Sequence, residues 1–255
     1  NRMTWRMAKI LDRLNMTSLV NKGRKQIGLR PVKDAWLNML GQHVIMASDK
    51  AISGVPPDVE PAVTQTGSLH LDQPDQYLEG LEKFLGAGPP PVYAGFGSMP
   101  KKDQMDNVSL FVRAARSAGK RIVIAKFWEE SSGFSDSEDV FFINNYPHRK
   151  LFPRMAGVIH HGGAGTVAAS AVSGVPQIVI PHILDQYYWG ERVYRCNLGP
   201  KPIWRSRLTS RKLAAAIQEA LSNDIMRQKA KEVSRMIDRR NNLDRAVREV
   251  IRGMN

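Results

Sequence analysis

From residue 92 onward, short apolar runs alternate with longer segments whose apolar positions recur at helical spacing. We expect the apolar runs to form strands, at 92–97, 121–127, 140–146, 157–161 and 176–181. We expect helices at 102–119, 148–155, 165–174 and 210–222, followed by a long C-terminal helix. Thr209 is the expected N-cap of the helix at 210–222. Continuous apolar strands separated by helices predict an α/β fold, a Rossmann-like parallel sheet with helices on both faces.

The amino-terminal part of the chain has a weaker pattern. It predicts a helix at 4–19, a second helix at 32–41 and one apolar strand, "HVIMAS", at 43–48, with a basic connector between the two helices. These elements are too few to enclose a core of their own. The stretch "SGVPPDVEPAVTQTG", at 53–67, has the proline and glycine content of a linker.

The two patterns together predict three parts. Residues 1–65 are expected to be the tail of an amino-terminal domain, of which most would lie upstream. Residues 66–91 are expected to be a linker that includes a short helix stopped by glycines and prolines. Residues 92–255 are expected to form the α/β domain.

Charge and cysteine content narrow the function. The chain has 37 Lys and Arg against 24 Asp and Glu, a formal net charge of +13, which favours anionic partners. Its single cysteine, Cys196, excludes an internal disulfide and cysteine-based zinc sites, and it fits a reducing compartment. We therefore expect no metal site and a cytoplasmic location.

The first expected helix carries a basic stripe and an apolar stripe at helical spacing. The basic stripe consists of Arg2, Arg6, Lys9 and Arg13, and the apolar stripe of Met3, Met7, Ile10 and Leu14. Such a helix can lie on a membrane surface, which would make the protein peripheral at a membrane. The alternative is an ordinary solvated helix face.

The sequence "HHGGAGT" joins the expected strand at 157–161 to the following helix. Its glycines, Gly162, Gly163 and Gly165, permit positive φ and a close approach of a ligand to the backbone. The first N–H groups of the helix form an anion site, and an imidazole adds a donor beside it. A tight turn alone would explain the glycines but not the adjacent His160 and His161, one of which strand alternation turns inward. We therefore expect a diphosphate site here.

Two other families share parts of this pattern. A dinucleotide-binding fold requires G-x-G-x-x-G/A, which Gly163, Gly165 and Ala168 satisfy, and an acid about twenty residues on, such as Asp185. Here the turn follows the fourth strand of its domain, and the acid does not lie at the tip of the next strand. A lipase-type hydrolase needs G-x-S-x-G, which the chain lacks, and Ser98 in "GFGSMP" is out of register for it.

Three longer segments resemble one family. The segments "VYAGFGSM", "PHRKLFPRMAGVIHHGGAGTVAAS" and "GVPQIVIPHILDQYYWGERV" resemble the carboxyl-terminal domain of family 1 glycosyltransferases with the GT-B fold. Within that family, the resemblance is to the branch of sterol glucosyltransferases and glycopeptide glycosyltransferases. The similarity runs in order from about residue 60 to about residue 225.

The resemblance implies roles for several residues around the diphosphate. His161 matches the histidine that contacts the diphosphate, and Ala164, Gly165 and Thr166 match its backbone and hydroxyl partners at the start of the helix. Ser98 matches a serine near the phosphates, although it could instead cap the segment that follows it.

Two further pairs of residues match positions that contact the sugar and the nucleobase in this family. Asp185 and Gln186 match an acid–amide pair that holds sugar hydroxyls, with a simple helix cap as the alternative for the acid. Tyr146 and His148 match the loop that reads the nucleobase. The "RK" that follows His148 stands where this branch often has Asp-Trp.

The resemblance also implies a reaction: inverting, metal-independent transfer of a sugar to a hydroxyl of a lipophilic acceptor. The donor would be a nucleoside-diphosphate sugar, with UDP-glucose expected, and the acceptor a sterol or another natural product. No further cofactor is implied. In this family the general base comes from the amino-terminal half, so the chain is expected to be a donor-binding fragment without it. The rival hypothesis is a basic module that binds RNA or a membrane, but no nucleic-acid motif supports RNA as a partner.

Overall fold

The structure is a computed structural model that describes residues 7, 10, 16–40, 43–59, 62–70, 74, 77–97, 101–126, 135–144, 146–238 and 241–254. The chain divides into two compact units. Unit 1 comprises Asn1–Lys50, Gly54–Leu69 and Arg240–Asn255, and unit 2 comprises Ala51–Ser53 and His70–Arg239. Residues 240–255, which were expected within the α/β domain, are thus grouped with unit 1.

Unit 1 contains a pair of short parallel strands. These are β1 (Val44–Met46) and β2 (Val63–Gln65), with Val44 opposite Val63. Strand β1 confirms the strand expected from "HVIMAS". The expectation of a linker at 53–67 is wrong for β2, because its three residues pair with β1 in spite of the prolines around them.

Three helices complete the described part of unit 1: α2 (Ser18–Gln26), α3 (Ala35–Leu40) and α11 (Asn241–Met254). The helix expected at 32–41 is confirmed by α3. The expectation of a basic connector between the two helices is wrong for the residues of α2, because they are helical, with basic side chains in the last turn. Of the helix expected at 4–19, the structure describes residues 7, 10 and 16–19, and all of these are helical. Within its two stripes the structure describes Met7 and Ile10, both exposed, and the other stripe residues lie outside the described residues.

A buried polar cluster joins α11 to the loops of unit 1. Asn242 donates from Nδ2 to the Asp49 carboxylate (3.4 Å) and to the Ser68 carbonyl (3.2 Å), and the Ser68 hydroxyl donates to Asp49. All three residues are buried. The site of Gly67 has no space for a side chain, because a Cβ there would lie 2.2 Å from Asn242 Nδ2.

We expect Asn242→Ala to lower the free energy of unfolding of unit 1 by about 1–3 kcal/mol, because it removes the hydrogen bonds that Nδ2 donates to a buried carboxylate and to a buried carbonyl. Urea denaturation followed by circular dichroism measures the loss. Arg248→Ala, on the exposed side of the same helix, is the control and should change stability by no more than about 0.5 kcal/mol. Equal losses in the two variants would contradict the role of the cluster.

Unit 2 is built on a five-stranded sheet with the order β5-β4-β3-β6-β7. The strands are β3 (Val92–Gly95), β4 (Ile122–Ala125), β5 (Val140–Ile143), β6 (Gly157–His160) and β7 (Gln177–Val179). Every adjacent pair is parallel. The strands lie where the apolar runs predicted them, and they are almost wholly buried, as strands covered on both faces are.

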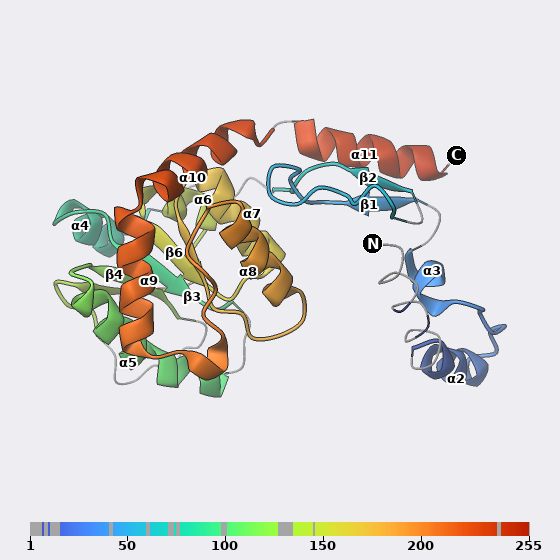
Figure 1. Cartoon of the computed structure of the whole chain (residues 1–255), viewed down its shortest axis with the longest axis horizontal. Coiled ribbons are helices and arrows are strands. Elements are labelled where there is room, and N and C mark those ends of the chain that lie inside the picture. The colour runs from blue at the N-terminus through green and yellow to red at the C-terminus, as the bar shows by residue number, and fades with distance from the viewer. Residues whose placement is uncertain are drawn as a thin grey trace. The chain divides into compact units, whose positions relative to one another are not determined.

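Helices cover both faces of this sheet (Figure 1). One face packs against α5 (Lys101–Ser117) and α9 (Ser210–Ser222) through a core that includes Phe111 and Ile217. The other face packs against α4 (Glu79–Gly86) and the short pair α6 (His148–Leu151) and η2 (Phe152–Arg154). The predicted architecture, an α/β fold with helices on both faces, is confirmed.

The remaining helices of unit 2 follow β6 along the chain. They are α7 (Ala164–Ser173), α8 (Asp185–Arg195), η3 (Arg205–Arg207) and α10 (Asp224–Met236). Thr209 caps α9 as predicted, because its Oγ1 accepts a hydrogen bond from the backbone N–H of Lys212 at 3.2 Å. The prediction of a single long C-terminal helix is wrong. The chain leaves helical geometry at Ile237, so that α10 and α11 are separate helices in different units.

An early segment of the chain packs against α8. Ile52 is buried, and its carbonyl accepts a hydrogen bond from Arg192 Nε at 2.8 Å. The hydroxyls of Ser53 and Tyr188 are hydrogen-bonded to each other. Residues 51–53, which were expected in the amino-terminal part, therefore belong to unit 2.

Candidate functional site

The order of the strands places a ligand crevice between β3 and β6. The chain moves outward from β3 to β4 and β5, then returns to β6 on the other side of β3. Ligands of open α/β sheets bind outside the carboxyl ends of the strands at such a switch point. Gly95 and His160 are paired across the two strands, so both strands end together, and their connections to α5 and α7 begin at the same edge.

The turn from β6 to α7 depends on glycine. Gly162 has a φ of +94°, and a Cβ there would lie 2.8 Å from Val179 Cγ1 and 2.9 Å from the carbonyl oxygen of Gln186. This close approach holds the turn against the beginning of α8. The first turns of α7 and α8, which carry most of the predicted site residues, are therefore neighbours.

The start of α7 presents backbone donors that the helix itself does not satisfy. Gly163 is the N-cap and provides no side-chain cap, and its carbonyl accepts hydrogen bonds from the N–H groups of Thr166 and Val167, each at 3.0 Å. The N–H groups of Ala164 and Gly165 come before this first helical hydrogen bond and have no acceptor within the helix. Both residues are exposed, and Thr166 is half-buried. An anion at this end would satisfy these donors and interact favourably with the helix dipole.

His160 is the structural member of the histidine pair. It is fully buried; its Nδ1 accepts a hydrogen bond from the N–H of Gly162 (3.1 Å), so its Nε2 carries the proton and donates to Gln177 Oε1 (3.0 Å). Burial, followed by the charge of the nearby His161, lowers the pKa of His160 to about 3. This imidazole stays neutral and fixes the turn, as strand alternation predicts for the inward member of the pair.

The pH dependence of stability should report this buried histidine. An unfolded histidine has a pKa of about 6.5, and the folded value is about 3, so below pH 6.5 the unfolded state binds one more proton than the folded state. The stability that comes from keeping His160 neutral is fully present above pH 6.5. Below that pH, the free energy of unfolding falls by about 1.4 kcal/mol per pH unit as the pH approaches 3. Urea unfolding at about pH 7 and about pH 5 measures the slope. A His160→Asn variant with an unchanged slope would contradict the assignment.

His161 lies between the two loops of the crevice. A Cβ at Gly97 would lie 3.1 Å from its Cε1, and a Cβ at Gly163 would lie 2.5 Å from its Nε2, so glycine on either side leaves room for the ring. Burial and the neighbouring His182 lower the pKa of His161, and Asp185 acts in the opposite direction. Its buried Nδ1 has no hydrogen-bond partner among the residues that the structure describes. A bound anion would favour the protonated ring.

The structure adds one residue that the sequence did not single out. His182 follows β7, donates from Nδ1 to the Ile180 carbonyl at 2.8 Å, and packs edge-on against Phe96 with ring centroids 4.7 Å apart. Its position after a predicted strand, at the same edge as His161, was the available signal. Together with His148 and His161 it makes this edge of the sheet rich in imidazoles.

Asp185 and Gln186 begin α8 but have different environments. Asp185 is exposed, and its Oδ2 accepts a hydrogen bond from Trp189 Nε1 at 3.2 Å. Gln186 is buried, and its Oε1 accepts hydrogen bonds from the N–H groups of His182 (2.8 Å) and Ile183 (3.1 Å). The amide oxygen therefore holds the turn that presents the carboxylate.

The residues that are predicted to contact the nucleobase lie at the other side of the crevice, after β5. The His148 ring stacks on Phe152, with centroids 4.4 Å apart and planes 15° apart, and its Nε2 is 3.3 Å from the Tyr93 hydroxyl. Burial, followed by the charge of His161, lowers the pKa of His148. Tyr146 is half-buried against the core beneath α6. Ser98 lies outside the described residues.

The sequence of the chain is similar to those of named glycosyltransferases. The vancomycin aglycone glucosyltransferase of Amycolatopsis orientalis is 37% identical over 209 residues, which are 80% of this chain and 49% of that protein. A sterol 3-beta-glucosyltransferase of Arabidopsis thaliana is 32% identical over 234 residues, 88% of this chain and 36% of that protein. The chain thus spans about half the length, or less, of these curated relatives.

Solved structures show the same fold. The glycotransferase of kitacinnamycin matches with a TM-score of 0.71 and 17% identity over 92% of this chain and 62% of that chain. A second structure, LpCGTa in complex with UDP, matches with a TM-score of 0.62 and 16% identity over 82% of this chain and 54% of that chain. The GT-B assignment from the motifs is confirmed.

The family profile described as "Erythromycin biosynthesis protein CIII-like, C-terminal domain" matches residues 115–243, which include the β6–α7 turn and the start of α8. The resemblance to sterol and glycopeptide glycosyltransferases, expected from the motifs, is confirmed as well. The chain belongs to the family of erythromycin biosynthesis protein CIII-like C-terminal domains.

Proposed function

We propose that the chain binds the diphosphate of a nucleotide sugar at the β6–α7 turn and forms the donor-binding part of a glycosyltransferase. The observation that supports this most strongly is one juxtaposition: the exposed first turn of α7 lies beside the His161 ring. Backbone donors that are already oriented, together with an imidazole, would stabilise the negative charge that develops on a departing diphosphate. The names of the relatives fit this role.

The sugar and the base would extend in opposite directions from the diphosphate. We assign the sugar hydroxyls to the exposed carboxylate of Asp185, which the neighbouring turn presents at the start of α8. The Oε1 atom of Gln186 already accepts hydrogen bonds from two backbone N–H groups. We therefore assign the predicted contact of Gln186 with the sugar to its Nε2 group. We assign the nucleobase to the side of the crevice that carries Tyr146 and His148.

The finer features of the reaction are also proposals. We propose UDP-glucose as the donor and a lipophilic hydroxyl compound as the acceptor, because the relatives include glucosyltransferases named for vancomycin aglycone and for sterols and one matched structure holds UDP. We propose transfer with inversion and without a metal, with the general base in the span of the relatives that this chain does not match. Donor binding without robust sugar transfer is then the expected behaviour of this polypeptide alone.

The location of the protein is a prediction from composition. Along the ranges that the structure describes, no helix has the length and the apolar character needed to cross a bilayer. We propose a cytoplasmic location, which the single cysteine fits. We also propose a peripheral contact with an anionic membrane, which the net charge of +13 favours.

Calorimetry with UDP, UMP and uridine tests the proposed function. We expect UDP to bind about 10- to 100-fold more tightly than UMP, because its second phosphoryl group reaches the start of α7 and gains charge-assisted hydrogen bonds. We expect Asp185→Asn to weaken UDP-glucose more than UDP, whereas Asp244→Asn in α11 leaves both unchanged. Equal affinities for UDP and uridine would refute a diphosphate site.

A further inference from the structure

A pocket lies at the opposite ends of the strands from the proposed diphosphate site. It has a volume of about 620 Å³, and its floor is formed by the residues that precede β6 and β7. The lining residues are Met155 and Ala156 before β6, Val175 and Pro176 before β7, and side chains of α10. The pocket is therefore at the amino ends of these strands, whereas the β6–α7 turn is at the carboxyl end of β6.

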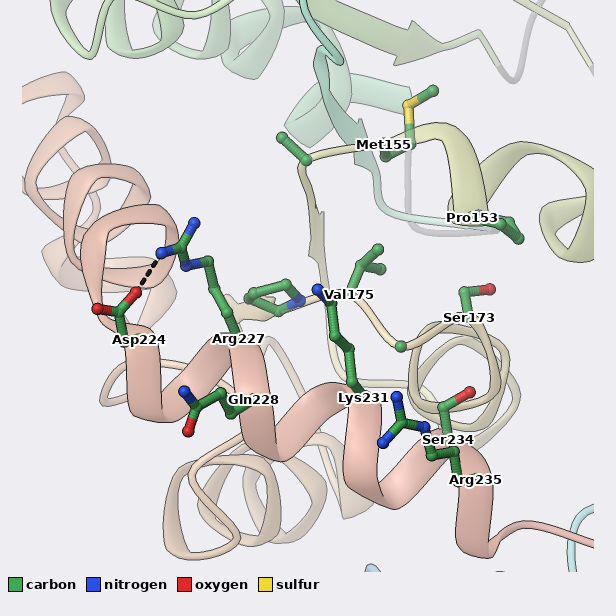
Figure 2. Close-up of a pocket in the computed structure, with 13 residues that line it drawn as sticks. Pro153, Met155, Ser173, Val175, Asp224, Arg227, Gln228, Lys231, Ser234 and Arg235 are labelled. Carbon is green, nitrogen blue, oxygen red and sulfur yellow. Dashed lines mark hydrogen bonds and ion pairs between the residues drawn. The ribbon is translucent and has the colours of Figure 1, made fainter.

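One wall of the pocket is a row of cations on α10. Arg227, Lys231 and Arg235 are spaced four residues apart, which places them on one face of the helix about 6 Å from one to the next. Figure 2 shows Lys231 extending from α10 toward Val175, whereas the Arg227 side chain is turned toward Asp224.

Only part of this positive charge is neutralised by the protein. Asp224 is the acidic residue that lines the pocket, and it forms an ion pair with Arg227. Across the described ranges of the chain, no ion pair or hydrogen bond involves the charged end of Lys231 or of Arg235. Lys229, two residues from Lys231 on the same helix, is instead paired with Glu232 at 2.9 Å and does not line the pocket.

These cations are not needed to satisfy the end of α7, which also borders the pocket. The carbonyl of Ala169 accepts a hydrogen bond from Ser173 Oγ (2.8 Å), and that of Ala171 accepts from the N–H of Gly174 (3.1 Å). The carbonyl of Val172 accepts from Ser234 Oγ at 2.6 Å. These three carbonyls therefore have donors other than the two cations, which are available to an external anion.

The wall that carries the cations is fixed in place. Ala230 and Val233 of α10 are buried in the core formed with α7 and α8. Gly174, with a φ of +69°, lets α10 approach closely, since a Cβ there would lie 3.3 Å from Ser234 Cβ. A helix backbone that is already packed in place lowers the entropy cost of ordering this wall around a ligand.

We propose that this pocket binds a phosphate-bearing ligand, with its phosphate between Lys231 and Arg235 and its carbon portion against Met155 and Val175. A guanidinium binds phosphate oxygens in pairs, and an ammonium adds a point charge beside it. The phosphate would belong to a soluble phosphate ester or to the headgroup of an anionic phospholipid. This site is separate from the diphosphate site and does not depend on the proposed function.

Two probes distinguish the sources. Glycerol 3-phosphate is titrated into the isotopically labelled chain, with the amide signals of Gly174 and Ser234 reporting on the pocket and that of Gly165 on the diphosphate site. Sedimentation with phosphatidylcholine vesicles, with and without phosphatidic acid, tests the headgroup. Saturable shifts at Gly174 assign a soluble ester, and binding only to vesicles with phosphatidic acid assigns the headgroup.

Matched variants test whether the pocket is responsible. We expect Lys231→Gln and Arg235→Gln each to weaken binding of the effective probe roughly tenfold, as the loss of a charged hydrogen-bond donor does. Lys229→Gln removes the same charge from the same helix outside the pocket and should change binding less than about twofold. The proposal is overturned if neither probe binds, if glycerol 3-phosphate shifts only Gly165, or if Lys229→Gln weakens binding as much as Lys231→Gln does.

Discussion

Replacing Gly162 by alanine is expected to abolish UDP binding, with a loss of affinity of more than about 100-fold, and to lower the free energy of unfolding by about 2–4 kcal/mol. The residue has a φ of +94°, which costs an L-residue about 1–2 kcal/mol. The new Cβ would also lie 2.8 Å from Val179 Cγ1 and 2.9 Å from the Gln186 carbonyl oxygen. The second of these contacts is with backbone, so the turn must move away from α8.

A matched glycine separates the two causes. Gly119 also has a positive φ, +65°, but a Cβ there would meet nothing within 4 Å. Gly119→Ala should therefore cost only the backbone term, about 1–2 kcal/mol, and should leave the affinity for UDP unchanged. Calorimetry on the folded variants measures the affinities, and urea denaturation measures the stabilities. If Gly162→Ala retained UDP binding, the turn would not be the ligand site.

Removing the His161 ring should weaken UDP about 10- to 100-fold while weakening UMP much less, because the ring is expected to donate to the diphosphate. Burial and His182 lower the pKa of the free ring, whereas a bound diphosphate raises it, so binding takes up a proton. The affinity for UDP should therefore rise as the pH falls from about 8 to about 6.

Calorimetry in buffers with different ionisation enthalpies measures this proton uptake directly. In His161→Ala the pH dependence should be much smaller. His43→Ala, which changes an exposed histidine of unit 1, should retain both the affinity and the proton uptake. A pH dependence that is unchanged in His161→Ala would assign the proton to another group, such as His148 or His182.

Local sequence patterns predicted the sheet of unit 2 and the turn at its edge. Strands β3 to β7 are short apolar runs bounded by glycines, prolines and helix caps, a pattern that is typical of buried parallel strands. The role of the glycines in the β6–α7 turn followed from the same local rules, as did the expectation that one histidine of the pair points inward, which the structure shows to be His160.

Features that depend on contacts between distant residues could not be predicted in this way. The segment 51–53 belongs to unit 2 because the Ile52 carbonyl meets Arg192, 140 residues away. Strand β2 forms in a proline-rich stretch because its backbone pairs with β1. Helix α11 joins unit 1 through Asn242, which is far in sequence from Asp49.

The sequence predicted the chemistry of individual side chains only in part. The sequence placed Asp185 and Gln186 together as a pair for sugar hydroxyls. It could not show that the Gln186 oxygen accepts the N–H groups of His182 and Ile183, since that depends on the fold of the turn. For His182 the available signal was its position after a strand, since a lone histidine there belongs to no spaced motif.

The central claim is that the first turn of α7 holds the diphosphate of a nucleotide. An NMR titration of the labelled chain with UDP tests it most directly, because the amide protons of Ala164, Gly165 and Thr166 are the proposed donors or lie beside them. We predict that these signals undergo the largest shifts, and that uridine at saturating concentration leaves them in place. Large shifts elsewhere, with these three signals unmoved by UDP, would contradict the claim.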